Sequence, residues 1–486
     1  MKKATIKVRD EVNCSIKGLD LDMRKKLVHE FEYEIPGAKF MPAYRLGRWN
    51  GMVSFFNLGG STYINLLPDI LPIMIADGWE VDVDDARDYQ SDFELTEVDK
   101  DTYSHVKWPK KHPIAGEPIV LRDYQIDVVN NFLKNPQCIQ EVATGAGKTL
   151  VTATLSERVQ EYGRSILIVP NKSLVVQTEE DYINMGLDVG VFYGNKHDYG
   201  KQHTICTWQS LNNMMKDTKS GKAEVTIGEF LEGVVCVMVD EVHSAKANAL
   251  KTILTGPMAH IPLRWGLTGT VPKEKFEFQS LHIGLGNVIN KVSAKELQDK
   301  GVLAQCQVKI VQLMDHAEHR DYQSELKYLL TDDKRLDALV DIISNANKTG
   351  NTLVLVDRVE SGKELAKRLG DGAVFVSGAT KSEDRKEHYD EVADTDNKII
   401  VATYGVAAVG INIPRIFNLM LLESGKSFVR VIQSIGRGVR KAKDKDFVQI
   451  WDITSSCKFA KRHLTKRKKF YKDAEYPFTL EKMEWK

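Results

Sequence analysis

Apolar and polar residues follow two different patterns along the chain, and the change comes near residue 121. Before that point, apolar residues recur at helical spacing in residues 20–33 and again in 66–77, whereas residues 52–56 indicate a strand. These short elements predict a small N-terminal domain that mixes helices and strands.

Beyond residue 121, short apolar runs alternate with amphipathic helical stretches. Such alternation is typical of a parallel sheet that is covered by helices on both faces. The pattern therefore predicts two α/β domains, the second beginning near residue 305 or shortly before it. The strand-like runs are residues 165–169, 204–207, 234–239, 308–313, 352–356, 373–376, 398–402, 419–422 and 447–450.

A change of composition separates the N-terminal domain from the first α/β domain. The stretch from residue 82 to 118 is first acidic and then rich in proline and lysine, and we interpret it as a linker segment. A chain of 486 residues is also too long for one typical core. The expected parts are an accessory domain at 1–95, a linker at 96–118, and α/β domains at 119–288 and 289–486.

Composition is that of a soluble globular protein. Hydrophobic residues make up 42% and charged residues 28%, and no apolar run reaches the roughly 18 residues of a membrane span. The first residues lack the apolar stretch of a signal peptide, so we expect a cytoplasmic protein with no membrane partner. Six scattered cysteines without a CxxC pair indicate buried free thiols rather than a zinc site or disulfides.

A glycine-rich segment, residues 142–149, lies between a short apolar strand and a helical stretch. It departs from the phosphate-loop pattern at Val142, where glycine is usual. Lys148 brings positive charge to the β- and γ-phosphates, Thr149 offers a hydroxyl to Mg²⁺, and the small residues let backbone amides approach the phosphates. The expected nucleotide-binding residues of this loop are Thr144, Gly145, Ala146, Gly147, Lys148 and Thr149.

A strand-like run ends in two carboxylates, Asp240 and Glu241, about 90 residues after the phosphate loop. Asp240 can hold Mg²⁺ through water, and Glu241 can polarise the water that attacks the γ-phosphate. Alone, the pair would equally well be a solvated acidic loop. At this distance from a phosphate loop, it predicts an ATP-hydrolysing site.

With these residues in place, the chain resembles superfamily 2 helicases of the DExH type from Leu121 to its end. The resemblance implies an α/β fold with two tandem RecA-like domains, ATP and Mg²⁺ as cofactors, and ATP hydrolysis coupled to movement on nucleic acid. It puts Gln125 on the adenine edge, with Arg122 or Tyr124 near the ring. Residues 268–270, Thr-Gly-Thr, stand where the family often has Ser/Thr-Ala-Thr, the element thought to couple hydrolysis to movement.

Other motifs resemble those with which the family holds nucleic acid. Residues 168–177 and 207–211 match two such motifs of the first α/β domain, and residues 402–414 match one of the second. The contacts that this resemblance implies are Pro170, Lys172, Gln177, Thr207, Trp208, Gln209 and Thr403.

The second α/β domain also carries the family's QxxGRxxR motif at residues 433–440. Arg437 and Arg440 are three residues apart, so that on one helix face both could reach the γ-phosphate; alone, they would indicate an exposed basic helix. The family pattern also puts Gly410 and Asn412 at the nucleotide cleft. The catalytic residues that follow are Glu241, Asp240, Lys148, Arg437, Arg440 and Gln433.

Within the superfamily, the chain is similar to the tailed-phage UvsW-type helicases, which remodel branched DNA. It is compact, and residues 42–51 are similar to an aromatic and basic segment of that family's N-terminal domain. Arg45, Arg48 and Trp49 could meet phosphates and stack on an exposed base, or be a buried Trp beside two solvated arginines. The resemblance implies a bacteriophage protein of DNA recombination, repair and replication, a monomer acting on forked DNA in the host cytoplasm.

The basic run at residues 461–469 either adds phosphate contacts or is a solvated helix face or tail. Three other functions stay open: a duplex-DNA translocase of restriction or chromatin type, an RNA helicase, and a nucleotide-regulated binding or annealing module. The last is disfavoured by Lys148, Asp240, Glu241 and Arg437 together, because a binding module needs no water-activating carboxylate.

Overall fold

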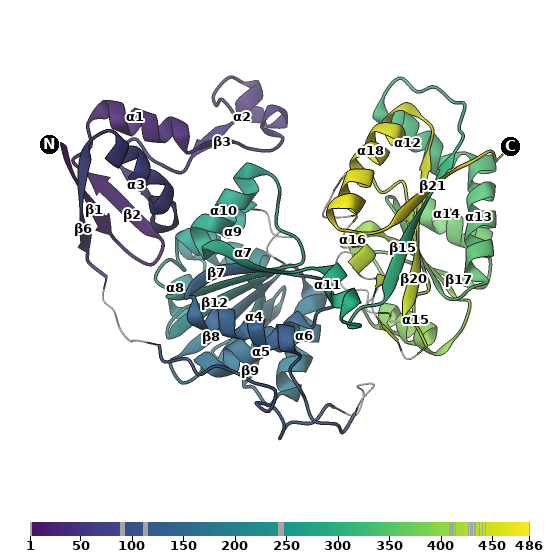
Figure 1. Cartoon of the computed structure of the whole chain (residues 1–486), viewed down its shortest axis with the longest axis horizontal. Helices are drawn as coiled ribbons and strands as arrows, with labels where there is room; N and C mark the ends of the chain where they lie inside the picture. The colour runs from purple at the N-terminus through teal and green to yellow at the C-terminus, as the bar shows by residue number, and fades with distance from the viewer. Residues whose placement is uncertain are drawn as a thin grey trace. The chain divides into compact units, whose positions relative to one another are not determined.

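The structure, a computed structural model, describes residues 2–485 apart from 88–92, 110–114, 242–246, 381, 408–412, 414, 426, 428–430, 432–433, 437, 440 and 443. The chain forms two compact units (Figure 1). The first unit comprises Met1–Glu141 and Lys148–Lys291, and the second comprises Val142–Gly147 and Val292–Lys486.

The first unit begins with the expected small α+β domain. Its sheet has the order β5-β2-β1-β6, and helices α1 and α3 lie against it (Figure 1). Alternate residues of β1 are buried in a core with Leu27 of α1 and Met74 of α3. Its elements are β1 (Lys2–Val8), β2 (Asn13–Lys17), α1 (Leu21–Glu30), β3 (Glu32–Glu34), η1 (Ala38–Phe40), α2 (Pro42–Arg45), β4 (Met52–Ser54), β5 (Ser61–Tyr63), η2 (Ile64–Leu66), α3 (Leu67–Ala76) and β6 (Trp79–Asp85).

The acidic start of the expected linker is instead a strand, so the linker interpretation was wrong for residues 82–85. Strand β6 pairs in parallel with β1 over its whole length. Lysines of β1 neutralise its carboxylates, with Lys7 Nζ 3.4 Å from Asp84 and Lys3 Nζ 3.6 Å from Glu80. Charge pairing between neighbouring strands explains why an acidic stretch forms a strand here.

The remainder of the first unit is an eight-stranded sheet of order β10-β9-β11-β8-β12-β13-β7-β14. The pairs from β9 to β7 are parallel, and β10 pairs antiparallel with β9. Its strands are β7 (Gln137–Val142), β8 (Arg164–Val169), β9 (Val189–Tyr193), β10 (Lys196–Asp198), β11 (His203–Thr207), β12 (Val234–Asp240), β13 (Leu263–Thr268) and β14 (Asn287–Val292). Its helices are α4 (Asp123–Lys134), α5 (Lys148–Val159), α6 (Lys172–Asn184), α7 (Trp208–Lys219), α8 (Ile227–Phe230), α9 (Ala247–Thr255) and α10 (Lys275–Leu285).

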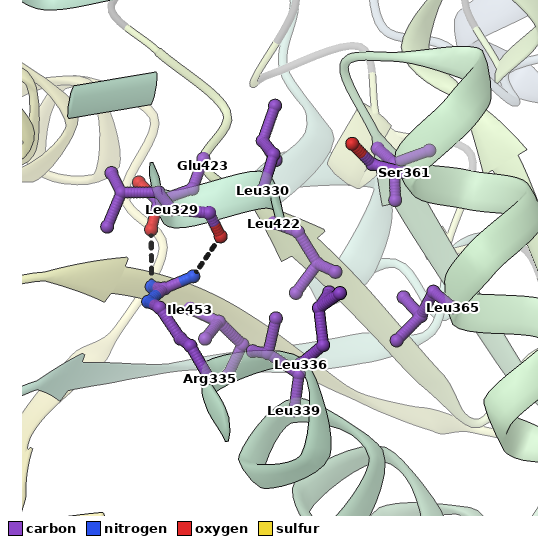
Figure 2. Close-up of a pocket in the computed structure, with 11 residues that line it drawn as sticks. Leu329, Leu330, Arg335, Leu336, Leu339, Ser361, Leu365, Leu422, Glu423 and Ile453 are labelled. Atoms are coloured by element: carbon purple, nitrogen blue, oxygen red, sulfur yellow. Dashed lines mark hydrogen bonds and ion pairs between the residues drawn. The ribbon is translucent and has the colours of Figure 1, made fainter. Parts of the chain in front are cut away.

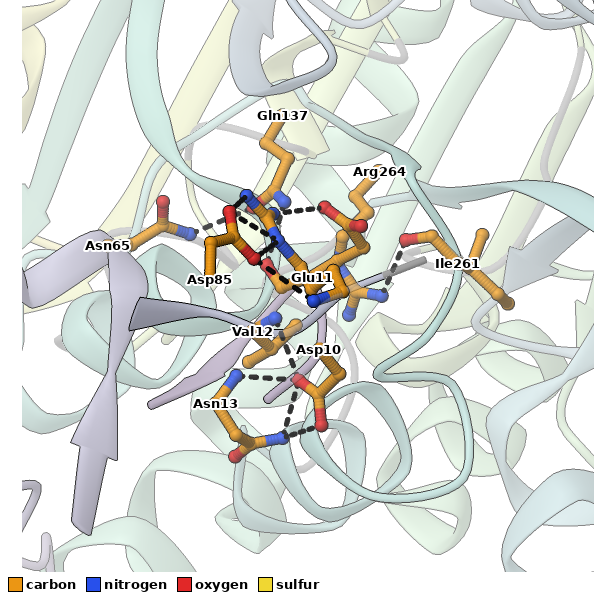
Figure 3. A network of polar contacts seen from close by, with 10 residues as sticks. Asp10, Glu11, Val12, Asn13, Asn65, Asp85, Gln137, Ile261 and Arg264 are labelled. Carbon is orange, nitrogen blue, oxygen red and sulfur yellow. Dashed lines mark hydrogen bonds and ion pairs between the residues drawn. The ribbon is translucent and has the colours of Figure 1, made fainter. Parts of the chain in front are cut away.

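Polar contacts hold the N-terminal domain to this sheet (Figure 3). The backbone amide of Glu11 donates to the carbonyl of Ala259 at 3.0 Å. Gln137 Nε2 donates to the Glu11 carbonyl at 2.8 Å. Asn65 Nδ2 donates to the carbonyl of His282 at 3.1 Å. In each of these contacts the acceptor is a backbone carbonyl, which the surrounding fold holds in place. The contacts therefore fix the orientation of the N-terminal domain on the sheet domain.

Apolar packing reinforces the same junction. Phe276 and Ile283 of α10 belong to the buried core of the N-terminal domain. The rings of Phe55 and Phe276 stack with centroids 5.9 Å apart, and Lys251 Nζ lies 5.0 Å from the Phe55 centroid. Burial lowers the pKa of Lys251. Helix α10 therefore contributes to the core of the N-terminal domain as well as to that of the eight-stranded sheet.

The second unit contains a seven-stranded sheet of order β17-β18-β16-β19-β20-β15-β21, in which every recorded pair among the described residues is parallel. Both expected parallel-sheet domains are thus confirmed. The strands are β15 (Gln305–Leu313), β16 (Thr352–Val356), β17 (Ala373–Val376), β18 (Ile399–Thr403), β19 (Asn418–Leu422), β20 (Phe447–Ser455) and β21 (Phe478–Met483). The helices are α11 (Ala294–Asp299), α12 (Tyr322–Thr331), α13 (Asp333–Asn347), α14 (Val359–Leu369), α15 (Ser382–Asp394), α16 (Tyr404–Ala407) and α18 (Lys458–Asp473).

All six cysteines are free and buried, as predicted. Within the described residues, no helix is both long and apolar enough to cross a membrane.

Candidate functional site

The predicted motifs of the first α/β domain begin where neighbouring parallel strands end. Strands β8, β12, β13 and β7 lie side by side in that order. The carboxyl ends of parallel strands share one edge of a sheet, which is where such sheets bind ligands. The fold therefore gathers at one edge the motifs that are spread over more than a hundred residues of sequence.

The phosphate loop follows β7 and ends at Lys148, the first residue of α5. Gly145 and Gly147 have φ angles of 88° and 77°, a left-handed backbone that glycine adopts without strain. Val142, the departure from the usual pattern, is the last residue of β7 and is buried. A strand residue needs no left-handed backbone, so valine is accommodated there.

The central contact of the site joins Lys148 and Glu241. Lys148 Nζ donates to Glu241 Oε1, and it lies 3.9 Å from Asp240 Oδ1. Both partners are almost inaccessible, with Lys148 9% and Glu241 6% exposed. Glu241 also has a φ of 52°, which is costly for a residue with a side chain. A strained carboxylate beside a buried ammonium at a sheet edge makes this pair a candidate functional site.

Glu241 also contacts the Thr-Gly-Thr segment that follows β13. The backbone amide of Gly269 donates to Glu241 Oε2 at 3.3 Å. The segment is itself closed by Thr268 Oγ1, which donates to the Thr270 carbonyl at 2.8 Å. Because a backbone amide makes the contact, glycine in place of the family's alanine does not remove it.

Thr149 and Asp240 are the residues that would hold Mg²⁺. A hydroxyl and a carboxylate are oxygen donors of the type that Mg²⁺ takes beside nucleotide phosphates. Asp240 Oδ1 accepts the Glu241 amide at 2.9 Å, which fixes the carboxylate at the end of β12. The donor set fits the ion, and the assignment stays a proposal.

The predicted adenine-binding residues lie at the start of α4. Gln125 is 3% exposed, and its Oε1 accepts the backbone amide of Arg122 at 3.0 Å, which caps the helix. Arg122 Nη1 donates to the Tyr124 hydroxyl at 3.1 Å. The structure thus brings the three residues together, with the Gln125 amide held in one orientation.

Two of the predicted nucleic-acid motifs meet at the sheet edge. Gln209 Nε2 donates to the carbonyl of Pro170 at 3.4 Å, linking the segments after β11 and β8. Gln209, Lys172 and Gln177 are exposed. Thr207 differs, because it is buried and its Oγ1 accepts the Ser210 amide as the cap of α7.

Trp208, at the start of α7, is half-buried and packs against the apolar core of the eight-stranded sheet. Its Nε1 is buried, and the structure records no hydrogen-bond partner for it among the described residues. In the second unit, Thr403 is half-buried at the end of β18. Predicted residues that lie outside the described ones are Gln433, Arg437, Arg440, Gly410 and Asn412.

The N-terminal segment 42–51 forms an exposed turn around the short helix α2. Arg45 and Arg48 are exposed, and Trp49 is half-buried, with its Nε1 donating to the Met52 carbonyl at 2.8 Å. Trp49 is therefore a turn-stabilising residue with one accessible side. Sequence reasoning missed the exposure of apolar residues in this turn and just before it: Phe40 at 66%, Met41 at 41%, Tyr44 at 41% and Leu46 at 64%.

Sequence reasoning also missed a buried ionic network in the second unit (Figure 2). Arg335, 1% exposed, donates through Nη2 to Glu423 Oε1 at 2.8 Å and through Nη1 to the Leu329 carbonyl at 2.6 Å. Desolvation raises the pKa of Glu423 to about 7, although Arg335 opposes the shift. No local motif marks these residues, since the partners are 88 positions apart.

The predicted basic run forms part of helix α18, but Arg467 is not on its exposed side. Arg467 is 1% exposed and forms two hydrogen bonds with Asp452, at 2.8 and 3.0 Å. Neither alternative for the basic run, a phosphate contact or a solvated face, therefore holds for Arg467. A buried carboxylate holds this guanidinium inside the fold.

Comparison with known proteins gives two family matches. The model of the type III restriction enzyme res subunit matches residues 118–273, and that of the helicase conserved C-terminal domain matches residues 334–442. The chain is 24% identical over 478 residues to the ATP-dependent DNA helicase uvsW of Enterobacteria phage T4, covering 93% of this chain and 91% of that protein. It is 23% identical over 386 residues to the DNA 3'-5' translocase XPB2 of Sulfurisphaera tokodaii, covering 70% and 83%.

Among solved structures, the fold is similar to that of a putative HsdR subunit fragment of a type I restriction enzyme from Vibrio vulnificus. The TM-score is 0.57 at 16% identity, with 97% of this chain and 85% of that chain covered. At this identity the likeness concerns the fold alone.

Proposed function

We propose that this chain, which belongs to superfamily 2 of the helicases and is an ATP-dependent helicase or translocase, remodels branched DNA. The reactions would be fork regression, branch migration and the unwinding of RNA–DNA loops. The setting would be DNA recombination, repair and replication in the cytoplasm of a bacterial host, with the protein acting as a monomer.

One observation carries the choice of substrate. The two helicase models begin only at residue 118, whereas the similarity to the phage T4 DNA helicase extends over 478 residues. It therefore includes the N-terminal domain, whose exposed turn combines Arg45 and Arg48 with accessible aromatic side chains. Cations beside stacking surfaces are suited to phosphates and unpaired bases, both of which a branch point presents.

The proposed chemistry starts from the Lys148–Glu241 pair. When ATP enters, Lys148 would turn to the β- and γ-phosphates, and Glu241 would orient the attacking water. Bound Mg²⁺ would neutralise phosphate charge, held by Thr149 and Asp240. The Gly269 amide, in contact with Glu241, would transmit the change to the segment after β13.

The remaining predicted residues keep their proposed roles. Arg437 and Arg440 would stabilise charge on the γ-phosphate, as guanidinium groups do in phosphoryl transfer. Gln433, Gly410 and Asn412 would line the nucleotide cleft. The nucleic acid would be held by Pro170, Lys172, Gln177, Thr207, Trp208, Gln209 and Thr403, and by Arg45, Arg48 and Trp49 of the N-terminal turn.

A duplex-DNA translocase is the second candidate. It is favoured by the match to a restriction-enzyme family and by the similarity to a DNA translocase over 386 residues. Such a motor would use the same ATP site but would not distinguish a branch from a plain duplex. An RNA helicase would be distinguished by the nucleic acid that stimulates its ATPase activity most strongly, which would be RNA.

The test is steady-state ATPase activity with single-stranded DNA, duplex DNA, forked DNA, four-way DNA and single-stranded RNA. We expect the largest stimulation with forked and four-way DNA, and none in Lys148→Ala. An Arg45→Ala/Arg48→Ala variant should keep its basal rate and lose the preference for branches. Equal stimulation by plain duplex would favour the translocase, and strongest stimulation by RNA would favour an RNA helicase.

A further inference from the structure

Helix α18 (Lys458–Asp473) of the second unit carries a stripe of positive charge on one side. The spacing of three or four residues puts the exposed basic residues on a single face. The opposite face is buried through Ala460, Leu464, Arg467 and Tyr471. The exposed basic residues are Lys458, Lys461, Arg462, Lys466, Lys469 and Lys472, and none of them forms a recorded ion pair with another described residue.

The helix is anchored by buried carboxylates and not through this stripe. Glu325, 1% exposed, accepts two backbone amides at the start of the helix, at 3.0 and 2.7 Å. Asp452 accepts from Arg467 and also from the Tyr471 hydroxyl at 2.7 Å. Folding of the helix is thus explained without the exposed cations, whose mutual repulsion is unfavourable.

A polyanion is the ligand chemistry that would relieve this repulsion. From Lys458 to Lys472 the helix rises about 21 Å, at about 1.5 Å per residue. The same length of duplex axis carries about twelve phosphate charges. We infer that α18 binds the phosphate backbone of a nucleic-acid duplex, as a contact surface separate from the helicase motifs; the choice of nucleic acid as the polyanion rests on the proposed function.

The same helix is in contact with the turn that follows β19. Arg467 Nη1 donates to the carbonyl of Gly425 at 2.8 Å. Gly425 has a φ of 73° and Glu423 a φ of 43°, so two residues of this turn are left-handed. In the sequence, the turn precedes the QxxGRxxR motif. Binding at α18 is therefore expected to be visible in ATPase activity as well as in affinity.

The test compares wild type with a Lys461→Ala/Lys466→Ala/Lys469→Ala variant, on plain duplex DNA over a series of salt concentrations. Each lost phosphate contact lowers the slope of log affinity against log salt by about 0.9. We expect the slope to fall by about 2–3 for the three lysines. The duplex concentration for half-maximal ATPase activity should rise, and the basal rate should not change.

The matched control is Lys334→Ala/Lys363→Ala/Lys367→Ala, which removes the same charge from exposed lysines on α13 and α14 of the same unit. It should keep the wild-type slope. A wild-type slope in the α18 variant, or equal losses in both variants, would overturn the inference. Because the readout uses plain duplex, a missing preference for branched DNA would refute the proposed function and leave this result unaffected.

Discussion

The two units contain the same uncommon feature, a buried glutamate with a left-handed backbone directly after a central strand. Glu241 follows β12 with a φ of 52°, and Glu423 follows β19 with a φ of 43°. Each is paired with a basic side chain from a helix, Glu241 with Lys148 and Glu423 with Arg335. The two sites nevertheless differ in how many hydrogen-bond acceptors surround the basic side chain.

The Arg335 guanidinium has hydrogen-bond acceptors on several sides. It donates to Glu423 and to the Leu329 carbonyl, and its Nε lies 3.4 Å from Asp315 Oδ2. Lys148 instead lies at the start of α5, next to a glycine-rich loop, and its recorded contacts are the carboxylates of Asp240 and Glu241 at the end of β12. An ammonium has three donors, so Lys148 can exchange one partner for a phosphate. We therefore propose that the same backbone conformation serves stability in the second unit and chemistry in the first.

The largest expected effect is on ATP hydrolysis, and it distinguishes Glu241 from Glu423. Glu241→Gln should lower the ATP hydrolysis rate by about 10²- to 10⁴-fold, the range for losing a proton-accepting side chain. Nucleotide binding should be kept or strengthened, since a negative charge near the phosphates is removed. ATPase assays and titration with a fluorescent nucleotide measure the two quantities. A wild-type hydrolysis rate would rule out this role for Glu241.

The next largest expected effect is on the stability of the second unit, and it distinguishes Glu423 from Glu241. Glu423→Ala should destabilise the second unit by about 3–5 kcal/mol, because it removes one of the two carboxylates that pair with the buried Arg335 guanidinium. Urea unfolding, followed by a probe in that unit, gives the difference. The double variant Arg335→Met/Glu423→Leu should recover part of the loss, since well-packed apolar residues can replace a buried pair. No loss in Glu423→Ala would show that the pair is not structural.

The smallest effect is a difference in pH dependence. The folded pKa of Glu423, about 7, lies above the ordinary glutamate value of 4.5, so its contribution to stability is present below about pH 4.5 and is lost as the pH rises through 7. His203 of β11 has the opposite sign, because burial lowers its pKa from 6.5 to about 4. Its contribution is present above pH 6.5 and is lost towards pH 4.

The variants Glu423→Gln and His203→Gln should each remove one of these trends from unfolding curves measured between pH 4 and 8. His203 Nδ1 lies 2.8 Å from Ser165 Oγ, so glutamine keeps a polar group at that position. Unchanged pH profiles in both variants would contradict the assignment of these titrations.

The sequence was sufficient for the elements whose signals are local. The apolar runs at 352–356 and 373–376 coincide with β16 and β17, and the phosphate loop lies between a strand and a helix as its spacing requires. Motifs carried at the ends of parallel strands were also foreseeable, because one type of fold dictates that placement.

What escaped prediction depends on partners that are distant in sequence. The acidic residues of β6 form a strand because lysines of β1 lie beside them. Arg467 belongs to a basic run but turns inward to Asp452, a residue of another element. The contact between Glu241 and the Gly269 amide likewise requires the three-dimensional register of β12 and β13.

The most direct test of the account is regression of a labelled replication fork with homologous arms, followed by separation of the DNA products. With ATP and Mg²⁺, wild type should convert the fork into a paired-strand duplex product, whereas Glu241→Gln should bind the fork without converting it. Conversion by Glu241→Gln, or a wild-type protein that hydrolyses ATP on forks without moving the branch, would contradict the account.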